Sequence, residues 1–124
     1  VAAGNKIYFG GGTSAFLPVN TVDIYDIEKN TWTTNEFSIQ RTFLSAAAAG
    51  NMVVFAGGFN GSYASPYFNT VDVYNSTANT WTANQLTIPR IYLAAAAGGN
   101  KILVAGGTSD AGIFSTVDIF TASQ

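Results

Sequence analysis

The sequence predicts an all-β protein made of repeated small antiparallel sheets, and three observations predict it. Residues 41–58 (RTFLSAAAAGNMVVFAGG) align without a gap with residues 90–107 (RIYLAAAAGGNKILVAGG), 49 positions later. The apolar runs are short and rich in Val, Ile, Phe, Tyr, Trp and Thr, with Gly and Asn between them. No segment sustains apolar residues at helical spacing. Repetition at this period together with strand-forming composition indicates an array of β units.

Each period contains four expected strands. The first is a small-residue run, and the second is almost continuously apolar. The third has the pattern Val-Asp-(Ile/Val)-(Tyr/Phe), and the fourth follows an Asn-Thr and carries a Trp. The expected first strands are residues 43–49 and 92–97, and the expected second strands are residues 6–10, 52–56 and 101–105. The expected third strands are residues 22–25, 71–74 and 117–120, and the expected fourth strands are the segments around Trp32 and Trp81. The segment after the second double glycine is three residues longer than its counterparts, which predicts a loop there.

The alanine tetrads at 46–49 and 94–97 would favour helix in isolation, yet Gly-rich turns and apolar runs follow them directly. A second strand that is apolar on both sides needs cover on both faces, and small sheets stacked around an axis provide it. The alanine strand is then predicted nearest the axis, where sheets converge and large side chains would collide. Gly50-Asn51 is expected to make a tight turn, and Gly57-Gly58 a sharp bend at the end of a strand.

Composition excludes several classes of function. The 124 residues form one domain-sized chain with a net charge of −2 and only five Lys and Arg. The scarcity of cations argues against nucleic acid and against anionic membrane surfaces as partners. No apolar run reaches the roughly 20 residues needed to cross a bilayer. The first residue is Val1, which leaves open that the sequence is a processed product or a fragment.

The ordered set of Arg, small-residue strand, apolar strand ending in Gly-Gly, Val-Asp-Ile-Tyr and Asn-Thr-Trp resembles the kelch repeat. The resemblance implies a β-propeller in which each repeat is one four-stranded antiparallel blade. Residues 1–40 are the expected blade 1 with a truncated inner strand, residues 41–89 a complete blade 2, and residues 90–124 a blade 3 without its outer strand. Together they form one partial propeller domain.

Fewer than three blades cannot close a ring, because propellers close with about four to eight blades. An isolated partial ring would expose an apolar blade face at each end. We therefore expect further blades, supplied either by the same longer chain or by other chains.

Catalytic chemistry is not expected in this segment. General acid–base, nucleophilic and metal sites need His, Cys or clustered carboxylates, and the sequence has no His and no Cys. Asp23, Asp72 and Asp118 occupy equivalent repeat positions, which predicts a structural role. Some kelch-like propellers are copper-radical oxidases resembling galactose oxidase, whose chemistry uses Cys, His and Tyr, and this segment supplies only Tyr. We expect no cofactor and no metal.

Aromatic residues in the connections are the candidate partner-binding residues, because loops on a rigid scaffold commonly carry binding aromatics. In kelch-like propellers these loops line one face. The alternative is that the rings fold back over blade edges. The candidates in the connections are Phe16, Tyr63, Tyr67, Phe68 and Phe114, and those just before the small-residue strands are Phe43 and Tyr92.

Arg41 and Arg90 precede the small-residue strands and have two interpretations. In the first interpretation, each guanidinium bonds carbonyls or carboxylates of its own blade. In the second, each guanidinium anchors an acidic partner. Asn60-Gly-Ser and Asn75-Ser-Thr are N-glycosylation sequons, although this composition produces about two such triplets by chance. The sequons and the low charge point to an extracellular or cell-surface location.

The predicted function is a non-catalytic interaction module that binds a protein, or a glycan, through loop aromatics on one face. One alternative is the propeller portion of a larger secreted enzyme resembling galactose oxidase-like oxidases. Another is a structural building block of an extracellular assembly.

Overall fold

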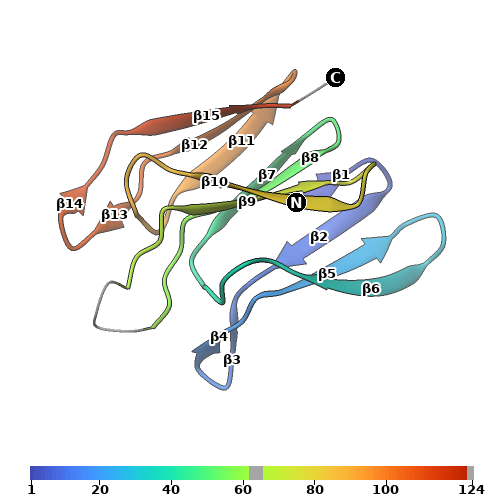
Figure 1. The fold of residues 1–124 in the computed structure, drawn as a ribbon, viewed down its shortest axis with the longest axis horizontal. Helices are drawn as coiled ribbons and strands as arrows, with labels where there is room; N and C mark the ends of the chain where they lie inside the picture. Colours follow the sequence, from blue (N-terminus) through green and yellow to red (C-terminus); the bar gives the residue numbers. More distant parts are fainter. Residues whose placement is uncertain (62–65, 123–124) are drawn as a thin grey trace.

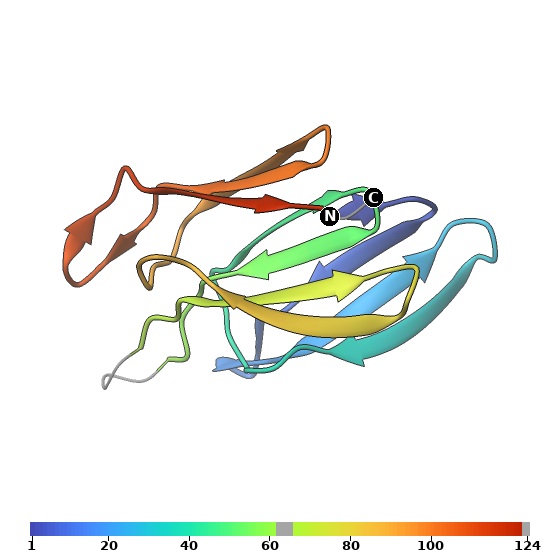
Figure 2. The same ribbon diagram turned by 45° about the horizontal axis from the view of Figure 1, so that its top comes forward.

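The computed structural model describes residues 1–61 and 66–122, and these residues form strands and turns stacked as three antiparallel sheets (Figures 1 and 2). Blade 1 consists of β1 (Ala2–Ala3), β2 (Lys6–Gly10), β5 (Thr21–Asp26) and β6 (Thr31–Glu36). Blade 2 consists of β7 (Ser45–Ala49), β8 (Met52–Ala56), β9 (Thr70–Asn75) and β10 (Thr80–Gln85). Blade 3 consists of β11 (Ala94–Gly98), β12 (Lys101–Ala105) and β15 (Val117–Thr121). The all-β prediction with kelch-like blades is confirmed.

Strand boundaries agree best where the apolar pattern is strongest. The second strands β2, β8 and β12 have the predicted bounds. The inner strands β7 and β11 begin two residues later than predicted, at Ser45 and Ala94. Phe43 and Tyr92 cannot belong to these strands because their φ angles are 56° and 57°, in the left-handed region.

Two short hairpins occupy connections predicted only as loops. They are β3 (Thr13–Ser14) with β4 (Leu17–Pro18), and β13 (Thr108–Ser109) with β14 (Gly112–Ile113). Each joins the second strand of a blade to the third. Figures 1 and 2 show these two connections, and the described ends of the one between β8 and β9, on one side of the stack. The tight turns that join β5 to β6, β9 to β10 and β11 to β12 lie on the opposite side. We call the side that holds the connections the connection side. No helix long and apolar enough to span a membrane occurs in the described part of the chain.

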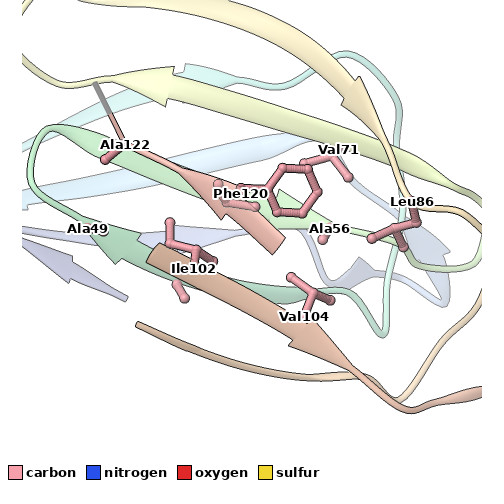
Figure 3. Packing of buried hydrophobic residues seen from close by; sticks show 10 residues of the cluster. Ala49, Ala56, Val71, Leu86, Ile102, Val104, Phe120 and Ala122 are labelled. Carbon is pink, nitrogen blue, oxygen red and sulfur yellow. The ribbon is translucent and has the colours of Figure 1, made fainter. Parts of the chain in front are cut away.

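The core lies in two layers, one on each face of blade 2. Between blades 1 and 2, Tyr8 and Ile24 pack in one cluster with Val53 and Phe55. Between blades 2 and 3, the cluster includes Val54 and the residues labelled in Figure 3: Ala49, Ala56, Val71, Leu86, Ile102, Val104, Phe120 and Ala122. Strand β8 is therefore covered on both faces, which explains its continuous apolar run. Full burial of each large apolar side chain contributes about 1.5–3 kcal/mol.

The alanine strand β7 lies between its counterparts in the neighbouring blades and contacts both β1 and β11. Ala47 and Ala49 are buried on it. Small side chains allow three sheets to come together at their inner strands, so packing overrides the helix propensity of alanine.

The double glycine after β8 permits a close approach between blades. Gly57 has φ 71°, and a Cβ at this position would lie 2.6 Å from the carbonyl oxygen of Arg90. The next amide, that of Gly58, donates to the same oxygen at 3.1 Å. Any larger residue at position 57 would push blade 3 away from blade 2.

Candidate partner-binding surface

Four aromatic rings form a chain across the connection side, and we call them the loop aromatic cluster: Phe43, Phe59, Tyr67 and Tyr92. The ring centroids of Phe43 and Tyr92 are 5.1 Å apart, and those of Phe43 and Phe59 are 6.4 Å apart. Tyr67 continues the chain at 5.7 Å from Phe59. The rings come from the segments before β7 and β11 and from the β8–β9 connection, so stacking of blades 2 and 3 assembles the cluster.

Phe43 and Tyr92 occupy the same position in consecutive repeats and share an unusual backbone. Both have positive φ, which for a bulky residue costs of order 1–3 kcal/mol. Bridges on the preceding residues hold them there: Thr42 pairs with Phe59, and Ile91 with Thr108. The amide of Tyr92 also donates to the carbonyl of Phe43 at 3.4 Å. The backbone thus fixes two rings that remain 47% and 63% exposed.

A tyrosine–aspartate pair borders the cluster. The hydroxyl of Tyr67 donates to Asp110 Oδ1 at 2.8 Å, which links the β8–β9 connection to the β13–β14 turn. This hydrogen bond to a carboxylate is the main reason that the pKa of Tyr67 lies above its usual value. Both residues line a groove of about 450 Å³ together with Ile88, Pro89, Ser109 and Ala111. The groove offers an apolar floor beside one negative charge.

Residues 40–83 match the family described as Kelch motif. The matched span holds the buried arginine, the alanine strand, the double glycine and the Trp strand of blade 2. The chain therefore contains a kelch motif. Kelch repeats generally mediate protein binding, and the kelch motif implies a propeller-type interaction module. Comparison with the curated proteins gives no match.

Kelch loop residues predicted as partner contacts differ in their placement. Phe43, Tyr67 and Tyr92 come together in the cluster, whereas Phe16, at the tip of the β3–β4 hairpin, is fully exposed and touches none of these rings. Phe68 and Phe114 are half-buried, and their amides bond to the carbonyls of Gly58 and Gly107. Tyr63 lies outside the described residues.

The two kelch arginines are structural. The Arg41 side chain is fully buried, and its Nη1 lies 2.7 Å from Asp72 Oδ2. Its Nη2 donates to the carbonyl of Phe55 at 3.0 Å, and the guanidinium lies 4.4 Å from the centre of the Phe37 ring. Burial lowers the pKa of Arg41, while Asp72 opposes that shift.

Arg90 repeats the arrangement. Its side chain is also fully buried, and its Nη1 lies 3.0 Å from Asp118. Its Nε donates to the carbonyl of Gly106 at 2.6 Å. The prediction that Arg41 and Arg90 contact a partner is therefore corrected, because both side chains are fully buried and each guanidinium pairs with an aspartate of its own blade.

The two aspartates that pair with these arginines, Asp72 and Asp118, each collect donors from the segment before the inner strand of their own blade. Asp72 accepts from the amide and hydroxyl of Ser38, and Asp118 accepts from those of Thr87. These bonds lock the connection between successive kelch blades. Asp23, at the equivalent place in blade 1, is exposed and has none of these donors among the described residues.

N-glycosylation of Asn60 and Asn75 stays a prediction. The side-chain oxygen of Asn75 accepts from the amides of Thr77 and Ala78 and so shapes the β9–β10 turn. The backbone amide of Asn60 donates to the carbonyl of Pro66 at 3.0 Å, at the base of the β8–β9 connection.

Sequence reasoning missed Phe59 and Asp110. Phe59 had a signal, because the equivalent positions after the other double glycines are Thr13 and Thr108. An aromatic residue in place of threonine departs from the repeat, which indicates that position 59 has a role specific to blade 2. Asp110 had no such signal, since it meets Tyr67 from 43 positions away only through blade stacking.

Proposed function

We propose that this chain is a non-catalytic interaction module that binds a protein partner through the loop aromatic cluster. One observation carries the proposal: Phe43 and Tyr92, equivalent residues of two blades, are held in a strained backbone and still expose their rings. Strain of this kind persists where the surroundings impose it, and it concentrates at functional positions.

The surface has the chemistry of a protein-binding hot spot. Aromatic rings bring a large contact area at low entropy cost, and a partner that covers them removes apolar surface from water. Backbone bridges at the base of the cluster, Thr42–Phe59, Phe59–Tyr67 and Ile91–Thr108, position its rings before binding. Asp110 adds a negative charge at the edge, which favours a partner with a Lys or Arg beside an apolar anchor.

The non-catalytic part of the proposal is supported by the missing His and Cys of the sequence. In addition, no group of three His, Cys, Asp or Glu side chains gathers within residues 1–61 and 66–122. The propeller portion of a larger secreted enzyme remains the alternative, with its catalytic groups outside this sequence. Flanking sequence that adds His and Cys near the connection side would favour that alternative.

The test compares matched variants in affinity capture of partners from the source tissue or culture. Phe43→Gly combined with Tyr92→Gly removes both rings and relieves the positive φ, so the melting temperature should stay the same or rise. Ile27→Ala is the control, because Ile27 is 53% exposed in the β5–β6 turn, away from the connection side. The proposal expects captured proteins to disappear with the double variant and to remain with the control. Equal capture by all three forms would refute it.

A glycan is the second ligand class, because aromatic faces stack on sugar rings and Asp110 accepts hydrogen bonds from hydroxyl groups. Enzymatic removal of glycans from the captured partner separates the two classes. Retained binding supports a protein surface, and lost binding supports a glycan. An extracellular location is part of the proposal, and the intact mass of native material tests it through sugar on Asn60 or Asn75.

A further inference from the structure

The connection side carries free negative charge and no free cationic side chain in the part of the chain that the structure describes. Its two arginines, Arg41 and Arg90, are buried, and each pairs with an aspartate. Asp110 is exposed in the β13–β14 turn, beside the loop aromatic cluster. The lysines of the sequence all lie at the opposite end of the blades, in a tight turn or directly after one: Lys6, Lys29 and Lys101. A partner that docks on the connection side therefore meets a carboxylate without a counter-charge.

Asp110 departs from the repeat. The hairpins β3–β4 and β13–β14 have the same register, and Ala15 occupies the place of Asp110 in the first of them. The hydrogen bond that closes the second hairpin comes from other residues, because the hydroxyl of Thr108 donates to the carbonyl of Gly112 at 2.8 Å. The carboxylate is therefore specific to blade 3, and the repeat does not explain it.

Tyr67 orients this carboxylate from the facing blade. Its hydroxyl donates to Asp110 Oδ1 at 2.8 Å, and its backbone is bridged to Phe59 in the β8–β9 connection. Among the described residues, only Tyr67 donates a hydrogen bond to Asp110. A carboxylate accepts about four hydrogen bonds, so Asp110 retains acceptor capacity for a donor with two N–H groups.

The groove that Tyr67 and Asp110 line, of about 450 Å³, suits one cationic side chain better than the other. Its floor includes Ile88, Pro89 and Ala111, which a chain of methylene groups can cover. A guanidinium is planar, gives two parallel N–H bonds to a carboxylate and stacks on an aromatic ring, whereas an ammonium group is a compact, strongly hydrated charge. Carboxylate, ring and apolar floor together favour arginine over lysine.

We propose that this groove, at the seam between blades 2 and 3, is a subsite for an arginine side chain of the protein partner. The guanidinium pairs with Asp110 and lies against the Tyr67 ring, and the methylene stem covers Ile88 and Pro89. The inference rests on the proposed function, because it takes the partner to cover the connection side. It adds the residue that this partner presents next to the loop aromatic cluster.

A random peptide library displayed on phage and selected on the full chain tests the arginine preference directly. Peptides selected on the parent chain should be enriched in Arg over Lys. Selection on Asp110→Asn, which keeps the shape of the side chain and removes its charge, should give no enrichment. Glu36→Gln is the matched control, because it removes an exposed carboxylate at the connection-side end of β6, in blade 1, and changes the net charge equally. The control should keep the enrichment, and its loss from both variants would overturn the proposal in favour of attraction by net charge.

Calorimetric titration of one selected peptide then measures the contribution of the guanidinium. Replacement of its Arg by citrulline, the uncharged isostere, should weaken binding to the parent chain about fivefold, and replacement by Lys about twofold. With Asp110→Asn the three peptides should bind equally. Absence of arginine enrichment on the parent chain, or equal affinity of the Arg and citrulline peptides for it, would overturn the proposal.

Phe43→Gly combined with Tyr92→Gly separates this inference from the proposed function. Selected peptides that lose affinity with the double variant but show no arginine preference would refute the arginine subsite and leave the aromatic surface supported. Peptides that depend on Asp110 and bind the double variant as well as the parent would refute the aromatic surface and leave the arginine subsite supported.

Discussion

Blades 1 and 2 present the same aromatic triad on the same face, with opposite exposure. In blade 1, Phe9 lies 6.0 Å and Tyr25 lies 5.0 Å from Trp32, and in blade 2 the equivalent distances to Trp81 are 6.1 and 4.9 Å. Phe9 is nevertheless 54% exposed, whereas its equivalent Phe55 is 1% exposed. The internal geometry of a blade is therefore independent of its cover, and only the neighbouring blade determines burial.

Blade 3 shows the same effect on its other face. Leu103 and Val117 are 40% and 48% exposed, while the equivalent Val54 and Val71 of blade 2 are fully buried. Apolar faces of this kind usually mark contact surfaces. Further blades, from a longer chain or from other chains, remain the expected cover.

The largest difference between the blades should come from their central phenylalanines. Phe55→Ala leaves a cavity between blades 1 and 2 and should cost about 3–5 kcal/mol of the free energy of unfolding. Phe9→Ala removes an exposed ring and should cost under about 1 kcal/mol. Urea denaturation of both variants measures the contrast. Similar losses would mean that the face of blade 1 is covered in solution.

The aspartates provide the next contrast. Asp72→Asn leaves the fully buried Arg41 without its counter-charge and should cost about 3 kcal/mol. Asp23→Asn changes an exposed group and should stay within about 0.5 kcal/mol. Thermal unfolding of the pair gives the comparison. A substantial loss from Asp23→Asn would indicate that another group pairs with Asp23 in solution.

Asn35 and Asn84, which occupy the same position in blades 1 and 2, should differ by less. Asn35→Ala removes the acceptor of the Trp81 indole N–H and should lower stability by about 1 kcal/mol. Asn84→Ala should leave the stability of the unliganded chain unchanged, because no described residue donates an indole to it. A double-mutant cycle with Trp81→Phe checks whether the Asn35 effect belongs to that bond. Additive losses would contradict the assignment.

The smallest effect concerns Tyr8, whose buried hydroxyl has no hydrogen-bond partner in the described structure. Tyr8→Phe should be neutral or stabilise by up to about 1 kcal/mol. Burial raises the pKa of Tyr8 above that of the unfolded chain. The folded state therefore favours the neutral phenol of Tyr8. Titration of Tyr8 does not lower the free energy of unfolding below about pH 10, the unfolded value, and lowers it as pH rises through the folded pKa. Tyr8→Phe should reduce alkaline destabilisation, and an unchanged alkaline transition would contradict this.

Prediction from the sequence succeeded where the physical cause is local or repeated. The bounds of β2, β8 and β12 followed from apolar runs between Gly and Asn. Bonding of Arg41 and Arg90 within the blade was one of two interpretations, and only burial decided between them. The two short hairpins and the late start of β7 were not predictable, because two-residue strands carry no pattern and a positive φ at Phe43 contradicts its local preference.

The amino-acid sequence by itself determined the all-β class, the kelch repeat and the division of each blade into two faces. These features depend on side-chain alternation, strand propensity and turn residues that act within a few positions. Only the tertiary structure decided which copy of each face is buried, and which rings meet at the seam between blades 2 and 3. Identical repeats have identical local preferences, so differences among them arise from their neighbours in space.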